Sequence, residues 1–194
     1  MANNDTIKKT VAVTLALCVV CSVIVSTAAV LLKPLQKENK QLDFNRNILA
    51  AAGLLEEDVS VSKQFEKVEV KLVDLRTGKF TTEVDLAKYD QRKAAKDPSL
   101  SEALGEKDIA GLSRREHYAQ AFLISDGGKL SKIILPVRGY GLWSTLYGFV
   151  ALESDLNTVI GIGYYEHGET PGLGGEVDNP RWKAVWSGKK VYGS

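Results

Sequence analysis

The sequence predicts an α+β protein in which a single N-terminal transmembrane helix is followed by a domain built on an antiparallel sheet. Two observations support this fold class. One long stretch near the N-terminus has no charged side chain, and the later sequence holds several short β-type runs separated by glycine turns. Few segments between those runs show a helical period, which is typical of an antiparallel sheet with minor helical additions.

The first predicted element is the apolar segment at 11–32. No charged residue occurs from Thr10 to Leu32, and as a helix this stretch would span about 33 Å, enough for a hydrocarbon core of about 30 Å. A cleaved signal peptide usually has a shorter apolar region of about 7 to 15 residues, and a long buried helix normally carries a polar face. We therefore expect an uncleaved anchor that crosses the membrane once.

The direction of this span is not set by the lysine count, because Lys8 and Lys9 precede it and Lys33 and Lys37 follow it. One early span followed by a large polar domain is the arrangement of a signal anchor, which exports its C-terminal part. We expect residues 1–10 in the cytoplasm, a bacterial inner-membrane location and a main domain in the periplasm.

Both cysteines of the chain lie inside the span. The C-x-x-C spacing of Cys18 and Cys21 puts them on one helix face. Half of an iron–sulfur site shared with another subunit would use that spacing, and two small apolar residues are the alternative. The exported domain has no cysteine, so the sequence predicts neither a disulfide nor a Cys-ligated metal there.

The residues at 33–120 form the first part of the expected domain. Leu35, Leu42 and Leu49 lie seven apart after Pro34 and predict an amphipathic helix that ends at Gly53. Alternating apolar and charged residues at 66–75, a turn at 76–79 and a further run at 80–84 predict a β-hairpin. The highly charged segment at 88–116 is expected to be an exposed connection with short helical pieces.

The residues at 121–194 form the second part, which is expected to hold the functional site. Apolar runs at 121–125, 132–137, 148–152 and 159–165 predict four further strands. The 25 basic and 24 acidic residues of the 194-residue chain leave a net charge of +1. Such a balance provides no field for attracting a polyanion, so nucleic acid is not an expected partner.

A loop at 164–175, YYEHGETPGLGG, follows the last of these runs. Glu166, His167 and Glu169 are potential metal ligands, but a structural zinc site needs four protein ligands, and the only other histidine, His117, lies in the charged connection. No G-x-S-x-G elbow is present, so a hydrolase is not expected. A plain tight loop with solvated side chains is the alternative.

An aromatic, glycine-rich segment lies upstream of that loop, at 138–148. Tyr140, Trp143 and Tyr147 alternate there with glycines directly before an expected strand. Flat side chains beside glycine backbone allow a ligand to approach closely. Together with the later glycine loop, this pattern suits a planar heteroaromatic ligand.

Three segments resemble one known family. RGYGLWSTLYGFVAL at 138–152, HGETPGLGGEV at 167–177 and NPRWKAVWSGKK at 179–190 are similar to the flavin-binding domain of NqrC from the sodium-translocating NADH:quinone oxidoreductase. The N-terminal anchor agrees, so the resemblance covers essentially the whole chain. The corresponding flavin protein of the related Rnf electron-transport complex is the alternative, because ETPGLG alone would fit it. A membrane-anchored envelope domain that binds a ligand without redox chemistry is a second alternative.

The resemblance implies an electron carrier in a membrane respiratory complex that couples NADH oxidation and quinone reduction to sodium export. It implies FMN held covalently, its phosphate esterified to a threonine in a D-x-x-(S/T)-G-A-T motif. The partners would be the other subunits, the membrane and a flavin transferase, and the chain would catalyse nothing alone. The residues expected to bind the cofactor are Tyr140, Trp143, Ser144, Glu169, Thr170, Gly172, Leu173 and Gly174.

The attachment motif of that family is absent from the sequence. No serine or threonine followed by Gly-Ala-Thr occurs, and the nearest string, at 26–29, lies inside the span. We therefore expect a C-terminally truncated version of the family, with an FMN-binding core that is incomplete at its C-terminus.

Overall fold

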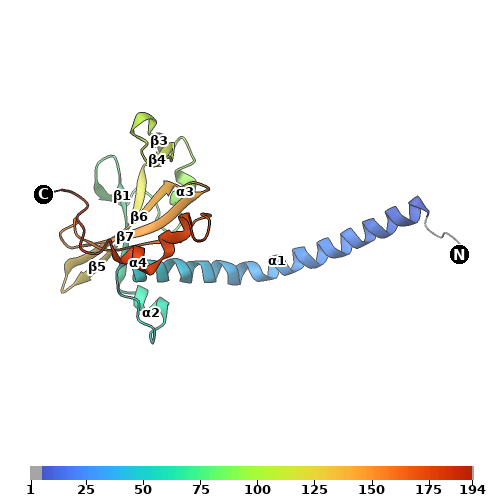
Figure 1. Cartoon of the computed structure of the whole chain (residues 1–194), viewed down its shortest axis with the longest axis horizontal. Coiled ribbons are helices and arrows are strands. Elements are labelled where there is room, and N and C mark those ends of the chain that lie inside the picture. The colour runs from blue at the N-terminus through green and yellow to red at the C-terminus, as the bar shows by residue number, and fades with distance from the viewer. Residues whose placement is uncertain (1–5, 194) are drawn as a thin grey trace. The chain divides into compact units, whose positions relative to one another are not determined.

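The computed structural model describes residues 6–193, and its contacts divide the chain into two compact units that meet between Leu42 and Asp43. The first unit is a part of one long helix. The second holds the end of that helix and a six-stranded antiparallel sheet (Figure 1). The expected fold class, a long apolar N-terminal helix followed by an antiparallel α+β domain, is confirmed.

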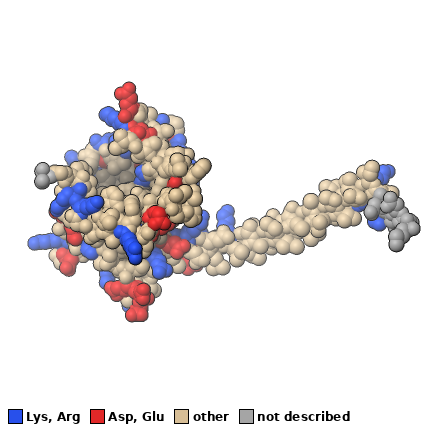
Figure 2. Space-filling model, in the orientation of Figure 1, with Lys and Arg blue, Asp and Glu red and all other residues tan. Residues whose placement is uncertain are grey.

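Helix α1 runs from Ile7 to Ala51 and includes Pro34 in its interior. The two helical segments expected on either side of that proline are therefore one element. Within α1 an 18-residue window reaches a mean hydropathy of 2.7 with none of it buried, so α1 is long and apolar enough to cross a membrane. Figure 2 shows no charged side chain along the middle of the helix. The hydroxyl of Thr14 donates to the carbonyl of Thr10 at 2.9 Å, which satisfies a polar group inside the apolar stretch.

The last turns of α1 supply the centre of the domain core. Ile48 and Leu49 are almost completely buried, and Gly53, with φ of +65°, follows the helix as the expected glycine stop. The ammonium group of Lys132 donates to the carbonyl of Ala52 at 2.9 Å. This contact places a positive charge at the C-terminal end of the helix, where its dipole is negative.

The sheet has the strand order β2-β1-β5-β6-β7-β8, and every neighbouring pair is antiparallel. The expected hairpin and the four expected later strands are all present. The strands are β1 (Val68–Asp74), β2 (Lys79–Thr81), β5 (Tyr118–Asp126), β6 (Lys129–Tyr140), β7 (Thr145–Glu153) and β8 (Val159–Glu166). The short helices are α2 (Val61–Phe65), α3 (Gln91–Ala94) and α4 (Pro180–Ala184), and 3₁₀ turns cover Gly105–Lys107 and Gly174–Asp178.

An aromatic cluster joins the end of α1 to the sheet. The ring of Phe44 meets those of Phe122, Phe149 and Tyr165 edge-on, at centroid distances of 6.0, 5.1 and 5.4 Å. Phe149 stacks on Tyr165 at 5.0 Å. Such pairs add to the free energy of area burial, so this cluster fixes β7 and β8 on the helix.

The charged connection contains more order than the sequence predicts. Besides α3, it holds a two-stranded pair of β3 (Ser101–Ala103) and β4 (Arg114–Glu116). Glu116 is buried, and it forms an ion pair with Arg138 of β6 and accepts a hydrogen bond from Gln91 of α3. A buried ion pair stabilises these strands in place of apolar side chains. Their short, charged sequences therefore show no alternating hydrophobic pattern.

The aromatic segment differs from its expected form. The sequence placed it directly before a strand expected at 148–152, but β6 extends to Tyr140 and β7 already begins at Thr145. The residues 141–144 are therefore a short hairpin turn between two long strands. Because the pairing extends to the end of both strands, this turn is firmly attached to the sheet.

Candidate functional site

The hairpin turn at 141–144, here called the aromatic turn, meets the segment at 167–174, here called the glycine loop. The start of β7 and the end of β8 are neighbours in the sheet, with Tyr147 opposite Glu166. The turn that precedes β7 and the loop that follows β8 therefore emerge at the same edge of the sheet. This topology brings together the two segments that the sequence singled out separately.

Glu169 of the glycine loop bonds directly to the aromatic turn. Its side-chain carboxylate accepts hydrogen bonds from the backbone amides of Leu142, Trp143 and Ser144, at 3.3, 3.0 and 3.1 Å. The residue is only 8% exposed. The hydrogen bond from Trp143 contributes most to holding the pKa of this carboxyl below its usual value, and Ser144 and Leu142 add to it. The carboxylate is therefore charged at neutral pH.

Two further hydrogen bonds fasten the glycine loop. The amide of Gly168 donates to the hydroxyl oxygen of Ser144 at 2.6 Å, and the amide of Glu169 donates to Nδ1 of His167 at 3.2 Å. An Nδ1 that accepts from an amide carries no proton, so the His167 proton lies on Nε2 when the ring is neutral. There it can donate to Asp178, whose carboxylate oxygen lies 2.8 Å away.

The glycines around Glu169 leave room for its side chain. A Cβ at Gly141 would overlap the Glu169 carboxylate and Leu146, and a Cβ at Gly174 would lie 2.8 Å from Oε2 of Glu169. The close approach of the two backbones to this side chain thus requires glycine at both positions. Gly172 has φ of +75°, which a side chain would strain.

Large apolar side chains project from this junction into solvent. Tyr140 is 60% exposed, Leu142 76%, Trp143 67% and Leu173 73%. The backbone amides of Leu142 and Trp143 donate to Glu169, as described above. Those of Tyr140 and Leu173 donate to the carbonyls of Ala110 and Thr170. No other part of residues 6–193 covers the four side chains. An exposed apolar group next to polar atoms, with Thr170 also exposed, fits a planar ligand that has apolar faces and a hydrogen-bonding rim.

A family model for the FMN-binding domain matches residues 141–193. This range contains both the aromatic turn and the glycine loop. The chain is 56% identical over 197 residues to NqrC of the Na(+)-translocating NADH-quinone reductase from Pseudomonas aeruginosa, covering 99% of this chain and 76% of that protein. It is 52% identical over 194 residues to the same protein of Vibrio vulnificus, with the same coverage.

The chain belongs to the NqrC family of Na(+)-translocating NADH-quinone reductases. It is therefore one of the subunits of that complex and contains an FMN-binding domain. The resemblance seen in the sequence is confirmed, and the family is NqrC rather than its counterpart in the Rnf complex.

Two solved structures have the same fold. The crystal structure of Shewanella oneidensis NqrC matches with a TM-score of 0.72 and 39% identity, over 78% of this chain and 71% of that one. The crystal structure of the same protein from Parabacteroides distasonis matches with a TM-score of 0.63 and 28% identity, over 83% and 71% of the two chains.

Arg92 of α3 contacts β7 and β8 next to the site, and no pattern in the sequence predicted this contact. The guanidinium of Arg92 in α3 lies 3.6 Å from the ring centroid of Tyr147 and bonds the carboxylate of Glu166 at 2.9 and 3.0 Å. It also donates to the hydroxyl of Tyr165 at 3.1 Å. Arg92 thus links α3 to β7 just after the aromatic turn and to β8 just before the glycine loop. No local pattern in the sequence indicates a partner so distant.

The three potential metal ligands at 166–169 have different partners. Glu166 bonds Arg92, His167 bonds Asp178 and Glu169 bonds the aromatic turn. Within residues 6–193, no group of three or more His, Cys, Asp or Glu side chains is placed to hold a metal ion.

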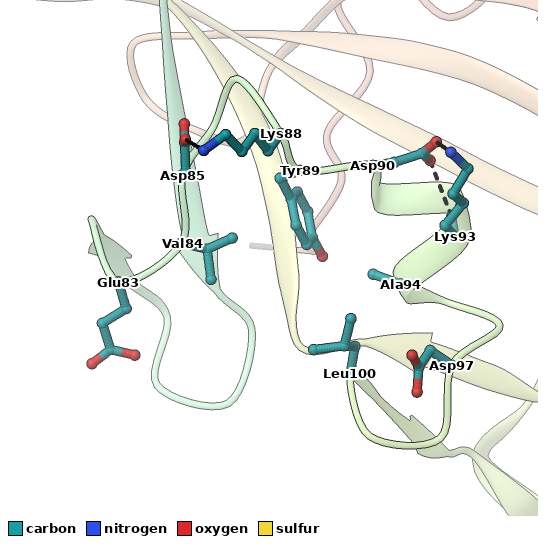
Figure 3. Close-up of a pocket in the computed structure, with 10 residues that line it drawn as sticks. All are labelled: Glu83, Val84, Asp85, Lys88, Tyr89, Asp90, Lys93, Ala94, Asp97 and Leu100. Atoms are coloured by element: carbon teal, nitrogen blue, oxygen red, sulfur yellow. Dashed lines mark hydrogen bonds and ion pairs between the residues drawn. The ribbon is translucent and has the colours of Figure 1, made fainter.

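A groove of about 490 Å³ lies in the charged connection and shares no residue with the two site segments. Figure 3 shows Val84, Tyr89, Ala94 and Leu100 around it and the ion pairs Asp85–Lys88 and Asp90–Lys93 at its rim. The Tyr89 hydroxyl donates to the carbonyl of Tyr118 at 2.7 Å, and burial raises the pKa of Tyr89 to about 12. The groove is therefore separate from the aromatic turn and the glycine loop.

Proposed function

We propose that this chain carries FMN on the surface formed by the aromatic turn and the glycine loop, and passes electrons between other subunits of the complex. The observation that supports this most is the exposure of Trp143 and Leu173 on backbone whose amides already donate hydrogen bonds. The amide of Trp143 donates to the Glu169 carboxylate, and that of Leu173 donates to the carbonyl of Thr170. A backbone held in this way loses little further conformational freedom when a ligand binds. The family model for FMN binding spans the same residues.

In this proposal the residues divide into two groups by chemistry. Tyr140, Trp143 and Leu173 cover the apolar faces of the ring system, because these side chains are flat or apolar and exposed. The hydroxyls of Ser144 and Thr170, with the amides around Gly172 and Gly174, bond the polar rim. FMN, when bound, supplies the redox chemistry, and the protein supplies orientation and a water-poor contact surface.

The mode of FMN attachment is part of the proposal. The resemblance implies a threonine phosphoester formed by a flavin transferase, and the 194 residues contain no serine or threonine followed by Gly-Ala-Thr. We infer that a polypeptide of these residues holds FMN through non-covalent contacts alone.

We further propose the arrangement in the membrane. Residues 11–32 of α1 form the anchor, residues 1–10 lie in the cytoplasm, and residues 33–120 and the FMN-binding core at 121–194 lie in the periplasm. An alkaline phosphatase fused after Ser194 should be active. An inactive phosphatase together with an active cytoplasmic reporter at the same point would show that the orientation is the opposite one. That result would leave the assignment of the cofactor site unchanged.

A titration of the full chain in detergent with FMN tests the cofactor assignment. Trp143→Ala should weaken FMN binding, because it removes the largest exposed ring at the junction. Tyr192→Ala is the matched control: Tyr192 is 69% exposed, close to the value for Trp143, but lies outside the two site segments. Equal FMN affinity in the two variants, with both folded, would place the cofactor elsewhere.

A further inference from the structure

The strongest unexplained feature of the site is a buried, charged carboxylate at the point where the aromatic turn and the glycine loop meet. Among residues 6–193 the buried charged residues are Asp74, Glu116 and Glu169. Asp74 and Glu116 pair with arginines, whereas no lysine or arginine in that range forms an ion pair with Glu169. Its oxygens instead accept three amides of consecutive residues, 142–144. Consecutive amides that converge in this way form a small concave site that favours an anion.

We propose that Glu169 is the positioning residue of the flavin site: its charged carboxylate closes the aromatic turn onto the glycine loop and so fixes Trp143 and Leu173 before FMN arrives. The inference rests on the proposed function for its cofactor. In this proposal Glu169 does not contact FMN itself, because both of its carboxylate oxygens already accept hydrogen bonds from backbone amides.

The exposed side chains cannot hold the two segments together themselves. Trp143 and Leu173 are each more than two-thirds exposed, so they bury little area against the rest of the domain. The contacts that join the segments are polar: the three amide bonds to Glu169 and the bond from Gly168 to Ser144. Three of these four bonds end on one side chain.

Charge, rather than size, is the property that the three amides require. A glutamine at 169 would have nearly the same shape, but its side-chain nitrogen cannot accept a hydrogen bond from an amide. One oxygen would then face three donors, and at least one of these N–H groups would lose its partner. The glycines at 141 and 174, which leave space for this side chain, would be unchanged by that substitution.

The other polar groups near Glu169 are also accounted for. His167 accepts the amide of Glu169 through Nδ1 and pairs with Asp178, and Asp178 lies 3.5 Å from the ammonium group of Lys183 in α4. These groups are hydrogen-bonded or paired with one another and with the amide of Glu169, not with its carboxylate. None of them can replace the carboxylate that faces the three amides.

Isosteric substitution with a matched control tests the proposal in the full chain. Glu169→Gln should lower the affinity for FMN roughly tenfold, since it removes charge-assisted hydrogen bonds that order the site. The control is Asp155→Asn in the turn between β7 and β8. The carboxylate of Asp155 also accepts two backbone amides, those of Asn157 and Thr158, at the other end of the same strands, and it pairs with Lys190. This control should leave FMN affinity within about twofold of the wild type.

Chemical rescue separates charge from size. In Glu169→Ala, added acetate should refill the space and restore FMN affinity by at least about threefold, while acetamide, which is neutral and of similar shape, should not. Equal rescue by the two compounds would mean that only volume matters and would overturn the proposal. So would wild-type FMN affinity in Glu169→Gln. If the alanine variant does not fold, the glutamine variant decides the question alone.

A readout without FMN separates this proposal from the cofactor assignment. With 5-fluorotryptophan in the chain, the ¹⁹F resonance of Trp143 should shift or broaden in Glu169→Gln and stay in place in Asp155→Asn. A Trp143 resonance that is identical in Glu169→Gln and wild type would refute the positioning role. If wild-type protein binds no FMN but its Trp143 resonance does respond to Glu169→Gln, the proposed cofactor fails and the positioning of the turn by Glu169 stands.

Discussion

The backbone amide of Trp143 donates to the carboxylate of Glu169 at 3.0 Å. The residue with the most exposed aromatic ring of the site is thus bonded through its backbone to one of the most buried side chains of the site. An exposed ring on a rigid backbone is a costly arrangement for a protein that has no ligand to cover it. It is a favourable arrangement for a cofactor carrier, because the binding surface needs little reorganisation.

Gly141 should be sensitive to the smallest substitution. A methyl group there would overlap the Glu169 carboxylate and Leu146, so Gly141→Ala should reduce the free energy of unfolding by about 1–3 kcal/mol and weaken FMN binding. Gly163→Ala in β8 is the control, because nothing lies within 4 Å of the added Cβ. Urea unfolding and FMN titration of both variants provide the comparison, and equal behaviour of the two would contradict the close approach at Gly141.

Arg92 should contribute measurably to stability even though part of it is exposed. Arg92→Ala removes the contact with the Tyr147 ring and the bonds to Glu166 and Tyr165, and should cost about 1–2 kcal/mol. Arg115→Ala removes only an exposed pair with Glu102 and should cost less than about 1 kcal/mol. Thermal and urea unfolding measure both. A larger loss of unfolding free energy for Arg115→Ala than for Arg92→Ala would contradict a stabilising role for the contacts of Arg92.

The sequence predicted the two site segments but not their connection. Trp143 stood out because aromatic residues and glycines alternate around it, a signal visible within a dozen residues. Leu173 was expected only from the resemblance to the family. Glu169 reaches the amides of 142–144 because β7 and β8 pair in antiparallel fashion. A single sequence does not show which loops a sheet brings to one edge. Arg92 lies 74 positions before Glu166, and its neighbours gave only the pattern of a charged connection.

The sheet itself was more accessible to prediction than the connection. The strands β5 to β8 alternate or run apolar for long enough to be recognised, and glycine turns separate several of them. The β3–β4 pair was missed because its buried contact is the ion pair of Glu116 with Arg138, which leaves no hydrophobic period in the sequence. Polar stabilisation of short strands is thus the main reason for the incomplete prediction.

Asp74 should make stability depend on acid pH. The side-chain hydrogen bond from Arg76 is the largest cause that holds the pKa of Asp74 at about 2, below its usual 3.8. A lowered pKa in the folded state stabilises the protein above the unfolded value, near pH 4, and this contribution is lost as the pH falls from about 4 to about 2. Asp74→Asn should therefore be less stable than wild type at pH 5, and the difference should shrink by pH 2.

Urea unfolding at several pH values between 2 and 5 measures that effect. Asp74→Asn removes the titrating carboxyl and leaves the other acids unchanged. A difference between wild type and variant that is the same at pH 5 and pH 2 would mean that the pairing with Arg76 does not depend on the charge of Asp74.

A polypeptide of these 194 residues should carry no covalent FMN when it is produced together with a flavin transferase. The phosphoester needs a hydroxyl within a specific motif, and no serine or threonine followed by Gly-Ala-Thr is present. Denaturing gel electrophoresis under ultraviolet light tests this. A fluorescent band at the size of the polypeptide would identify an acceptor hydroxyl outside the known motif.

The most direct test of the FMN site uses the three tryptophans of the chain. Trp143 lies in the aromatic turn, whereas Trp182 and Trp186 contact each other in and after α4, with ring centroids 5.6 Å apart. In full-length protein labelled with 5-fluorotryptophan and assigned by single Trp→Phe variants, addition of FMN should shift the ¹⁹F resonance of Trp143 far more than the other two. A Trp143 resonance that stays in place while FMN binds, or a larger shift at Trp182 or Trp186, would contradict the assignment of the aromatic turn and the glycine loop as the flavin site.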